Sequence, residues 1–313
     1  MPKAGGLLYV GSYDARCLLK EAKIQILKHR IIFFIFAYTV IITDLCHMIS
    51  ASKSKLIRSL RQKKYRDQHR LFPVEGEKMV MELLTLEPKN PFQIRELIAT
   101  PEWLERHHET LKRSGTEHTE SSLKEIKKLS NLIAPQPVIA LVNMPGTSFA
   151  PEKLVNIPVL AFESIRDPGN LGTIIRTADW FGISQIVCSP DSTDLFNPKV
   201  VQSTMGAIAR VQVHYRDLNA VLESRELENK AVFGTFMDGE NLYETSLGPD
   251  PLIVFGNESH GLSGHIATRI RQRITIPSFS PSGKGSESLN VASSVAVICS
   301  ELRRRQDPTQ SGN

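Results

Sequence analysis

Asn170 and Arg176 lie six residues apart, and both side chains can donate hydrogen bonds to a ligand. Arg176 stays protonated in proteins, so it can bind an anion but is a poor base. Asn170 could orient a hydroxyl group or Arg176 itself. A purely structural interpretation is also open, in which Arg176 pairs with Asp179 or Glu163.

Two further polar groups stand where a strand ends or a helix begins. The triplet 256–258 (Gly-Asn-Glu) follows the apolar run 252–255, and α/β sheets usually bind ligands at such strand ends. Ser288 and Asn290 are expected in the first turn of a helix, beside N–H groups that lack helical partners. Ser286 or Ser288 is the expected cap of that helix. On structural grounds alone, these residues would be a strand-end turn and a helix cap.

The elements that must position these groups alternate between short apolar strands and helices. Expected strands cover residues 158–163, 185–188, 211–215, 232–237, 252–255 and 273–277, and expected helices cover 171–181, 197–206, 218–227 and a last one up to about 305. Pro168 and Gly169 fit type II positions in a turn over 166–170. Short apolar strands are typical of a parallel sheet covered on both faces. The sequence therefore predicts an α/β fold.

Taken together and in this order, the three stretches resemble the SpoU/TrmH family of S-adenosylmethionine-dependent RNA ribose 2′-O-methyltransferases, within the SPOUT superfamily. The matching residues are Asn170, Arg176, Gly256-Asn257-Glu258, Ile276-Pro277 and Ser288-Leu289-Asn290. The match covers roughly residues 155–303. It implies a SPOUT-type parallel sheet with a trefoil knot in the C-terminal loops and helix, S-adenosyl-L-methionine as cofactor, no metal, and an active site at the interface of a homodimer.

The resemblance also implies residue roles. The catalytic residues would be Asn170, Arg176, Glu258, Ser288 and Asn290. The cofactor-binding residues would be Phe255, Gly256, Asn257, Glu258, Ile276, Ser288 and Leu289. In the cofactor loop, backbone groups would bind the adenine while apolar side chains pack on it. Arg176 would bind a phosphate or stabilise the developing alkoxide. The proton acceptor stays open, and a substrate phosphate is one candidate.

Residues 48–146 are predicted to form a smaller α/β domain, the first domain of the chain. A linker at 145–148 joins it to the methyltransferase domain at 150–307. A weaker resemblance here is to substrate-binding domains like ribosomal protein L30e. Its start is strongly basic, and we expect RNA contacts from Lys53, Lys55, Arg58, Arg61, Lys63, Lys64 and Arg66, with Lys284 in the later loop. By itself, such a run could also be a solvated helix face.

Residues 1–47 fit neither domain. The apolar run 31–42 is twelve residues long, whereas a membrane-spanning helix needs about 20. We expect the functional chain to begin at Met48, with residues 1–47 an extension that can be removed without loss of activity; a membrane anchor is the alternative. Residues 308–313 read as a polar tail.

Composition agrees with an RNA enzyme but does not identify the RNA. The net charge is +5, and no cysteine or histidine pair has the spacing of a metal site. The sequence around Lys284 lacks the glycine and Ser/Thr positions of a nucleotide-binding phosphate loop. We expect a cytoplasmic enzyme acting on ribosomal RNA, with large-subunit RNA favoured. The alternatives are a transfer RNA methyltransferase and a non-catalytic RNA-binding or ribosome-assembly protein.

Overall fold

The computed structural model describes residues 25, 28–30, 49–86, 90–146, 148–280 and 288–306. The chain divides into two units after Met48, and every element below lies in the second unit. The expected tail at 308–313 and nearly all of the extension at 1–47 lie outside the described residues. Within the described ranges, no helix is long and apolar enough to cross a membrane.

The first part of this unit is a mixed four-stranded sheet with helices. Its elements are α2 (Ala51–Ser59), α3 (Lys63–His69), β1 (Leu71–Glu75), α4 (Glu77–Leu84), β2 (Ile94–Ala99), α5 (Pro101–Arg106), α6 (His108–Ser114), β3 (His118–Glu120), α7 (Leu123–Leu129) and β4 (Val138–Asn143). The strand order is β1-β4-β2-β3, and only β2 and β3 run parallel. The expected small α/β fold is therefore present.

Local chemistry explains most of these elements. Thr100 and Ser122 accept hydrogen bonds from Trp103 N and Glu125 N, and so cap α5 and α7. The basic segment at the start of this part forms two helices, α2 and α3, because the chain breaks at 60–62. Pro73 lies in β1, which sequence reasoning missed; an edge strand tolerates a residue without an N–H.

The second part is a six-stranded parallel sheet in the order β10-β8-β9-β5-β6-β7. Its elements are η1 (Pro151–Leu154), β5 (Val159–Phe162), α8 (Pro168–Trp180), β6 (Gln185–Cys188), α9 (Pro198–Thr204), η2 (Ala207–Ala209), β7 (Gln212–Tyr215), α10 (Leu218–Leu222), η3 (Arg225–Leu227), β8 (Val232–Asn241), β9 (Leu252–Phe255), α11 (Gly264–Ala267), β10 (Gln272–Thr275) and α12 (Val291–Gln306). The parallel sheet confirms the prediction.

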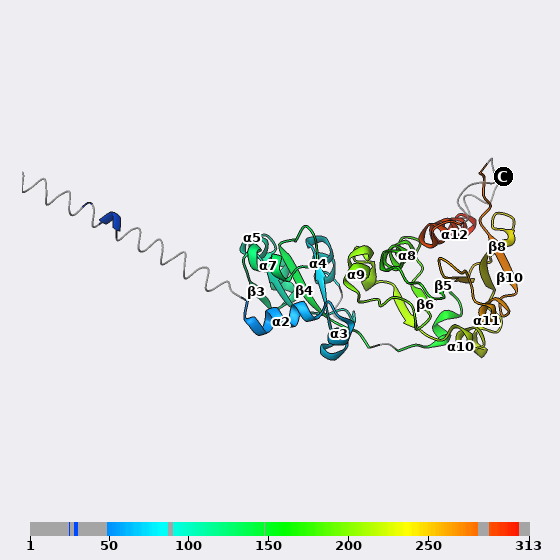
Figure 1. The fold of residues 1–313 in the computed structure, drawn as a ribbon, viewed down its shortest axis with the longest axis horizontal. Helices are drawn as coiled ribbons and strands as arrows, with labels where there is room; N and C mark the ends of the chain where they lie inside the picture. The colour runs from blue at the N-terminus through cyan, green and yellow to red at the C-terminus, as the bar shows by residue number, and fades with distance from the viewer. Residues whose placement is uncertain are drawn as a thin grey trace, which may run out of the picture. The chain divides into compact units, whose positions relative to one another are not determined.

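Helices cover both faces of this sheet, with α8, α9 and α12 on one side and α10 and α11 on the other (Figure 1). Successive strand residues point to opposite faces. Leu160 and Phe162 therefore pack into the hydrophobic core shared with α8, α9 and α12, while Val159 and Ala161 pack into the core shared with α10 and α11. The knot that the resemblance implies stays a prediction, and residues 281–287 of the loop before α12 lie outside the described ranges.

Residues of the two sheets share one hydrophobic core. The rings of Phe72 in β1 and Phe196, just before α9, lie 4.8 Å apart. Arg210 pairs with Glu82 of α4 and, through two nitrogens, with Asp179 of α8 at 2.8 and 2.7 Å. These contacts tie α4 to α8, the helix that carries Asn170 and Arg176.

Candidate active site

The first site segment follows the carboxyl end of β5. Asp167 caps α8, because its Oδ1 accepts from Asn170 N at 2.8 Å, and Pro168 takes the first helical position. The expected turn over 166–170 is thus the start of a helix, which places Asn170 in its first turn. A Cβ on Gly172 would lie 2.4 Å from Ser203 Cβ, so this glycine lets α8 pack closely on α9.

The second segment follows β9, the neighbour of β5. Asn257 and Gly261 exchange two backbone hydrogen bonds of 2.9 Å, which folds the loop back on itself. A Cβ on Gly256 would lie 2.1 Å from Gly261 C. The close approach that requires this glycine is therefore that of the loop's own backbone.

The third segment is the start of α12, where Asn290 is the cap. Its Oδ1 accepts from Ala292 N at 2.9 Å and from Ser293 N at 3.4 Å. The helix begins later than predicted, at Val291. The predictions that Ser286 or Ser288 caps it, and that Asn290 lies in its first turn, are therefore wrong. Ser288 is exposed and precedes the cap.

A chain of side-chain hydrogen bonds joins the three segments. Asn290 Nδ2 donates to Asn170 Oδ1 at 3.0 Å, and Asn170 Nδ2 donates to Glu258 Oε1 at 3.1 Å. These residues are 120 and 88 positions apart in the sequence. The fold thus brings three of the five expected catalytic residues into one hydrogen-bonded group at the strand ends.

A second network holds the loop that carries Glu258. Ser164 has a φ of 56°, a left-handed conformation that costs a non-glycine residue energy. Its carbonyl accepts from Asn257 Nδ2 at 2.8 Å, and its Oγ donates to Asp191 Oδ2 at 2.6 Å. Hydrogen bonds from Ser164 and Ser189 lower the pKa of Asp191. Sequence reasoning missed Ser164 and Asp191, because neither belongs to a spaced motif.

Arg176 stands apart from these networks. It is exposed and makes no hydrogen bond or ion pair with any residue that the structure describes. Asp179 pairs with Arg210, and Glu163 accepts from Ser263 N at 2.7 Å. The structural interpretation of Arg176 as a partner of either carboxylate is therefore wrong, and its guanidinium is available to a ligand.

The expected cofactor residues fall into two sets. The Phe255 side chain is buried and stacks on Phe162 at 5.1 Å, so only its main chain could meet a ligand. Leu289, by contrast, is 52% exposed, and Ile276 is half-buried. The main chains of Ile276 and Leu289 make no hydrogen bond to another described residue. Apolar side chains beside free backbone groups fit an adenine ring.

The basic residues at the start of the first sheet are not all available to RNA. Arg66 is 2% exposed and donates to Asp194 at 2.5 Å and to Leu60 O at 2.9 Å, so its predicted RNA contact is wrong. Lys53 is half-buried against Glu96 and Thr119. Exposed basic residues of the predicted set are Lys55, Arg58, Arg61, Lys63 and Lys64; Lys284 lies outside the described residues.

Comparison with known proteins decides the family. The SpoU rRNA Methylase family model matches residues 158–300, and an MRM3-like substrate binding domain model matches residues 52–140. A solved TrmH-family protein from Porphyromonas gingivalis is 38% identical over 82% of this chain and 99% of its own, with a TM-score of 0.70. The chain belongs to the SpoU/TrmH family of RNA methyltransferases.

Relatives within the SpoU/TrmH family agree with this placement. The 23S rRNA (guanosine(2553)-2′-O)-methyltransferase RlmP of Bacillus subtilis is 29% identical over 80% of this chain and 96% of its own length. An AdoMet-bound rRNA methyltransferase from Sinorhizobium meliloti is 27% identical, covers 82% of this chain and 97% of its own, and has a TM-score of 0.69.

Proposed function

We propose that this chain transfers a methyl group from S-adenosyl-L-methionine to a ribose 2′-hydroxyl of RNA, with ribosomal RNA the favoured substrate. The observation that carries the proposal is the hydrogen-bonded group Asn290–Asn170–Glu258, with the free guanidinium of Arg176 on the same helix as Asn170. The residues of this group come from the three segments that carry the family resemblance.

The cofactor would supply an electrophilic methyl group held in line with the attacking oxygen. Gly256–Glu258, Ile276 and Ser288–Leu289 would border it. Asn170 is fixed from both sides, since Asn290 donates to its oxygen and its own nitrogen donates to Glu258. A fixed amide or carboxylate beside a ribose hydroxyl can hold that hydroxyl in the geometry that attack requires.

Arg176 would act on charge. Its side chain is exposed two turns into α8, on the face that also presents Thr173 and Trp180. A guanidinium remains protonated, so it would bind a phosphate of the RNA or stabilise the developing alkoxide while another group takes the proton. A substrate phosphate remains the candidate acceptor.

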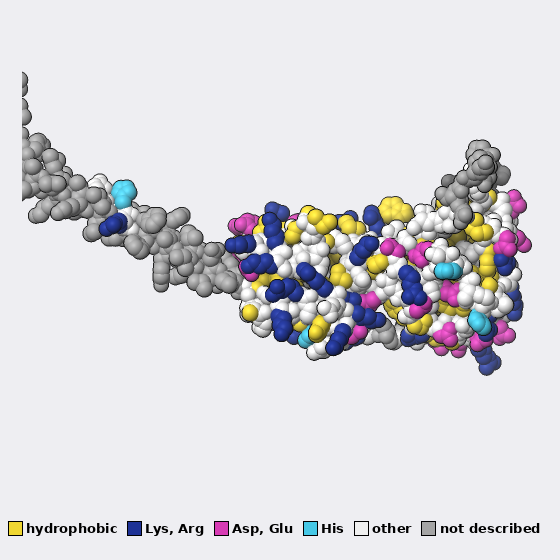
Figure 2. Space-filling model, viewed as in Figure 1, with side chains coloured by type: hydrophobic (Ala, Val, Ile, Leu, Met, Phe, Trp, Pro, Cys, Tyr) yellow, Lys and Arg dark blue, Asp and Glu magenta, His cyan; other side chains and the backbone are white. Residues whose placement is uncertain are grey.

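The charge distribution supports RNA as substrate. Residues 49–146 hold 17 Lys and Arg against 12 Asp and Glu, a net charge of +5, whereas residues 147–313 hold 15 against 18, a net charge of −3. Figure 2 shows the basic side chains gathered over the first domain on the face drawn. We therefore assign most electrostatic attraction of the phosphate backbone to residues 48–146, as a substrate-binding domain. The relatives named for 23S rRNA favour ribosomal over transfer RNA.

The proposal includes a homodimer in the cytoplasm. Trp180 is 85% exposed on α8, and Ser293 and Ser300 are exposed on α12. A large exposed aromatic side chain of this kind is enriched where two protein chains pack together. Light scattering at the concentrations used for activity tests this, and a fully active monomer would contradict it.

The function itself is tested in two steps. Calorimetry should show that S-adenosylmethionine binds to the purified protein. Ribose-methylation mapping of total RNA should show one 2′-O-methylated site that is absent from the RNA made without the protein. Cofactor binding without any lost methylation site would contradict the enzyme assignment and favour a non-catalytic RNA-binding protein. A lost site in transfer RNA would replace the ribosomal substrate.

A further inference from the structure

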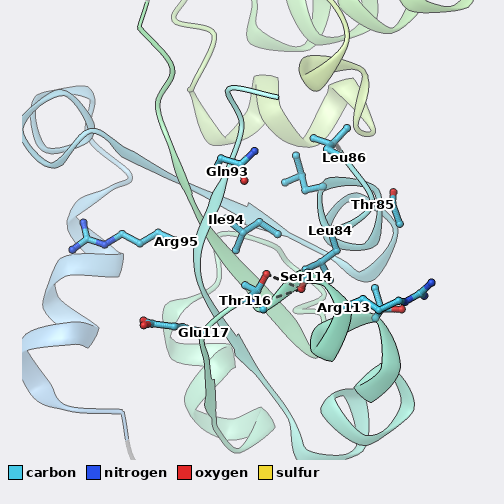
Figure 3. Close-up of a pocket in the computed structure, with 13 residues that line it drawn as sticks. Leu84, Thr85, Leu86, Gln93, Ile94, Arg95, Arg113, Ser114, Thr116 and Glu117 are labelled. Atoms are coloured by element: carbon cyan, nitrogen blue, oxygen red, sulfur yellow. Dashed lines mark hydrogen bonds between the residues drawn. The ribbon is translucent and has the colours of Figure 1, made fainter. Parts of the chain in front are cut away.

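The first domain contains a groove at the end of its sheet. The residues that line it lie within 83–117, outside the basic helices α2 and α3. The groove has a cavity of about 650 Å³, walled by the C-terminal ends of α4 and α6 and by the start of β2. Figure 3 shows Ile94 and Leu84 near its centre, with Leu86 above them and Thr116 below. The size fits one unpaired nucleotide, since small-molecule pockets hold about 300–1,000 Å³.

The floor of the groove is apolar and its rim is polar. Leu83 is buried, and Leu84, Leu86 and Ile94 are half-buried, so the last three present apolar surface to the opening. On the rim, Thr116 Oγ1 donates to Ser114 Oγ at 2.9 Å. Apolar surface can hold a base, and hydroxyls at the edge can bond its polar groups.

Two arginines flank the groove. Arg95 and Arg113 are exposed, and neither makes a hydrogen bond or ion pair with any residue in the described ranges. Figure 3 shows their side chains extending from opposite sides of the groove. This separation suits the sugar–phosphate chain that enters and leaves around a single bound base. Glu117 is the acidic residue on the lining, and it would oppose a phosphate there.

The backbone at Arg95 is irregular in a way that exposes it. The pairing of β2 with β4 shifts between Ile94 and Glu96, which makes Arg95 the extra residue of a β-bulge. The parallel pairing with β3 begins only at Leu97, so this end of β2 forms a sheet edge. Bulges of this kind turn a side chain away from the regular direction and are common beside functional sites.

We propose that this groove binds an unpaired nucleotide of the RNA substrate, with the base on Leu84, Leu86 and Ile94 and the neighbouring phosphates on Arg95 and Arg113. The proposal rests on the proposed function, because RNA is taken as the substrate. It adds a second, single-strand contact to the general attraction of the basic helices. The groove's α4 wall is tied through Glu82 and Arg210 to α8, so RNA held there is held relative to Arg176.

The test is the binding of two probes to the full chain: a 12-nucleotide oligouridylate and a 12-base-pair RNA duplex. Arg95→Ala with Arg113→Ala should weaken oligouridylate binding about tenfold and lower its salt slope by about 1.4, at about 0.7 per lost phosphate contact. Duplex binding should change much less. Glu117→Gln should strengthen oligouridylate binding, because it removes the charge that opposes phosphate.

The matched control removes two positive charges elsewhere in the domain. Lys124→Ala with Lys127→Ala, on the exposed side of α7, should change binding of both probes equally and only slightly. Ser114→Leu keeps the charge but fills the groove, and it should also weaken oligouridylate binding. Melting temperatures equal to that of the unsubstituted chain show that the exposed substitutions leave the fold intact.

Photocrosslinking gives a position. A 12-mer carrying 4-thiouridine should crosslink to peptides containing residues 93–95 or 113–117. Crosslinks confined to α2 and α3, or a double arginine variant that binds like the lysine control, would overturn the groove. If methyl transfer and cofactor binding persist in that case, the proposed function stands while the groove proposal fails. If RNA binding depends on the groove but the chain shows no transferase activity, the groove proposal stands while the proposed function fails.

Discussion

The most discriminating single position is Asn290, because its two side-chain atoms do different things. The oxygen caps α12 through Ala292 N and Ser293 N, and the nitrogen donates to Asn170. Asn290→Asp keeps an oxygen that can cap the helix but removes the donor. Asn290→Ala removes both. The pair of variants therefore separates stability from positioning.

The magnitudes follow from these contacts. Losing a side-chain cap costs about 1 kcal/mol, which lowers the melting temperature of a protein this size by about 2–4 °C. Asn290→Ala should show that loss. Asn290→Asp should stay within about 1 °C, because a carboxylate at a helix N-terminus gains about 0.3–1 kcal/mol while one hydrogen bond of similar worth is lost. Both variants should methylate about tenfold more slowly, as expected when Asn170 loses the bond that orients it.

The assay is single-turnover methylation beside calorimetric titration of S-adenosylmethionine. Asn290→Ala should also bind the cofactor more weakly, since Ser288 and Leu289 directly precede the lost cap, whereas Asn290→Asp should bind it nearly normally. On an Asn170→Ala background, Asn290→Asp should slow the reaction little further, because the two residues act through one hydrogen bond. An Asn290→Asp variant with full rate would refute this reasoning.

Three other outcomes are expected. Arg176→Ala should leave cofactor binding nearly unchanged and slow turnover about 10²–10³-fold, with little recovery in Arg176→Lys, as single-turnover methylation would show; a matching loss of cofactor affinity would assign Arg176 to the cofactor instead. Arg210→Met should speed amide exchange in α4 and α8 by breaking the link between them, and unchanged exchange would show that the shared core alone holds them. Hydrogen bonds from Arg304, then Arg305, lower the pKa of Glu301 from 4.5 to about 2. The stability that ionised Glu301 contributes is therefore complete above about pH 4.5 and is lost as the pH falls toward 2. Urea unfolding should show Glu301→Gln less stable than the unsubstituted chain at about pH 7, with the difference in unfolding free energy closing in acid.

Local features were readable from the sequence because they depend on neighbouring residues. Thr100 before Pro101 predicts the cap and start of α5, and both are confirmed. Asp167 before Pro168 has the same signature, yet the following glycine favoured a turn, and the helix start was missed. The cap of α12 was misplaced because Ser and Asn are both good cap residues, and no local pattern chooses between Ser288 and Asn290.

Long-range pairing was not readable. Arg66 lies in a basic run that predicts a solvated or RNA-binding face, but its partner Asp194 is 128 residues away, and no spacing rule connects them. The same holds for the chain from Asn290 through Asn170 to Glu258. Its convergence was expected only from the family resemblance, and the position of Ser164 beneath Asn257 was not expected at all.

Helix α8 connects the proposed reacting groups to the proposed RNA-binding groove. Asn170 is in its first turn, and Asp179 lies nine residues later, about 14 Å along the axis, where Arg210 ties it to α4. The end of α4 walls the groove of the first domain. One rigid helix can therefore hold the reacting groups at a fixed distance from a bound single strand. In that arrangement the first domain would select the nucleotide by its distance from the groove, and the residues around Asn170 would act on the ribose at that distance.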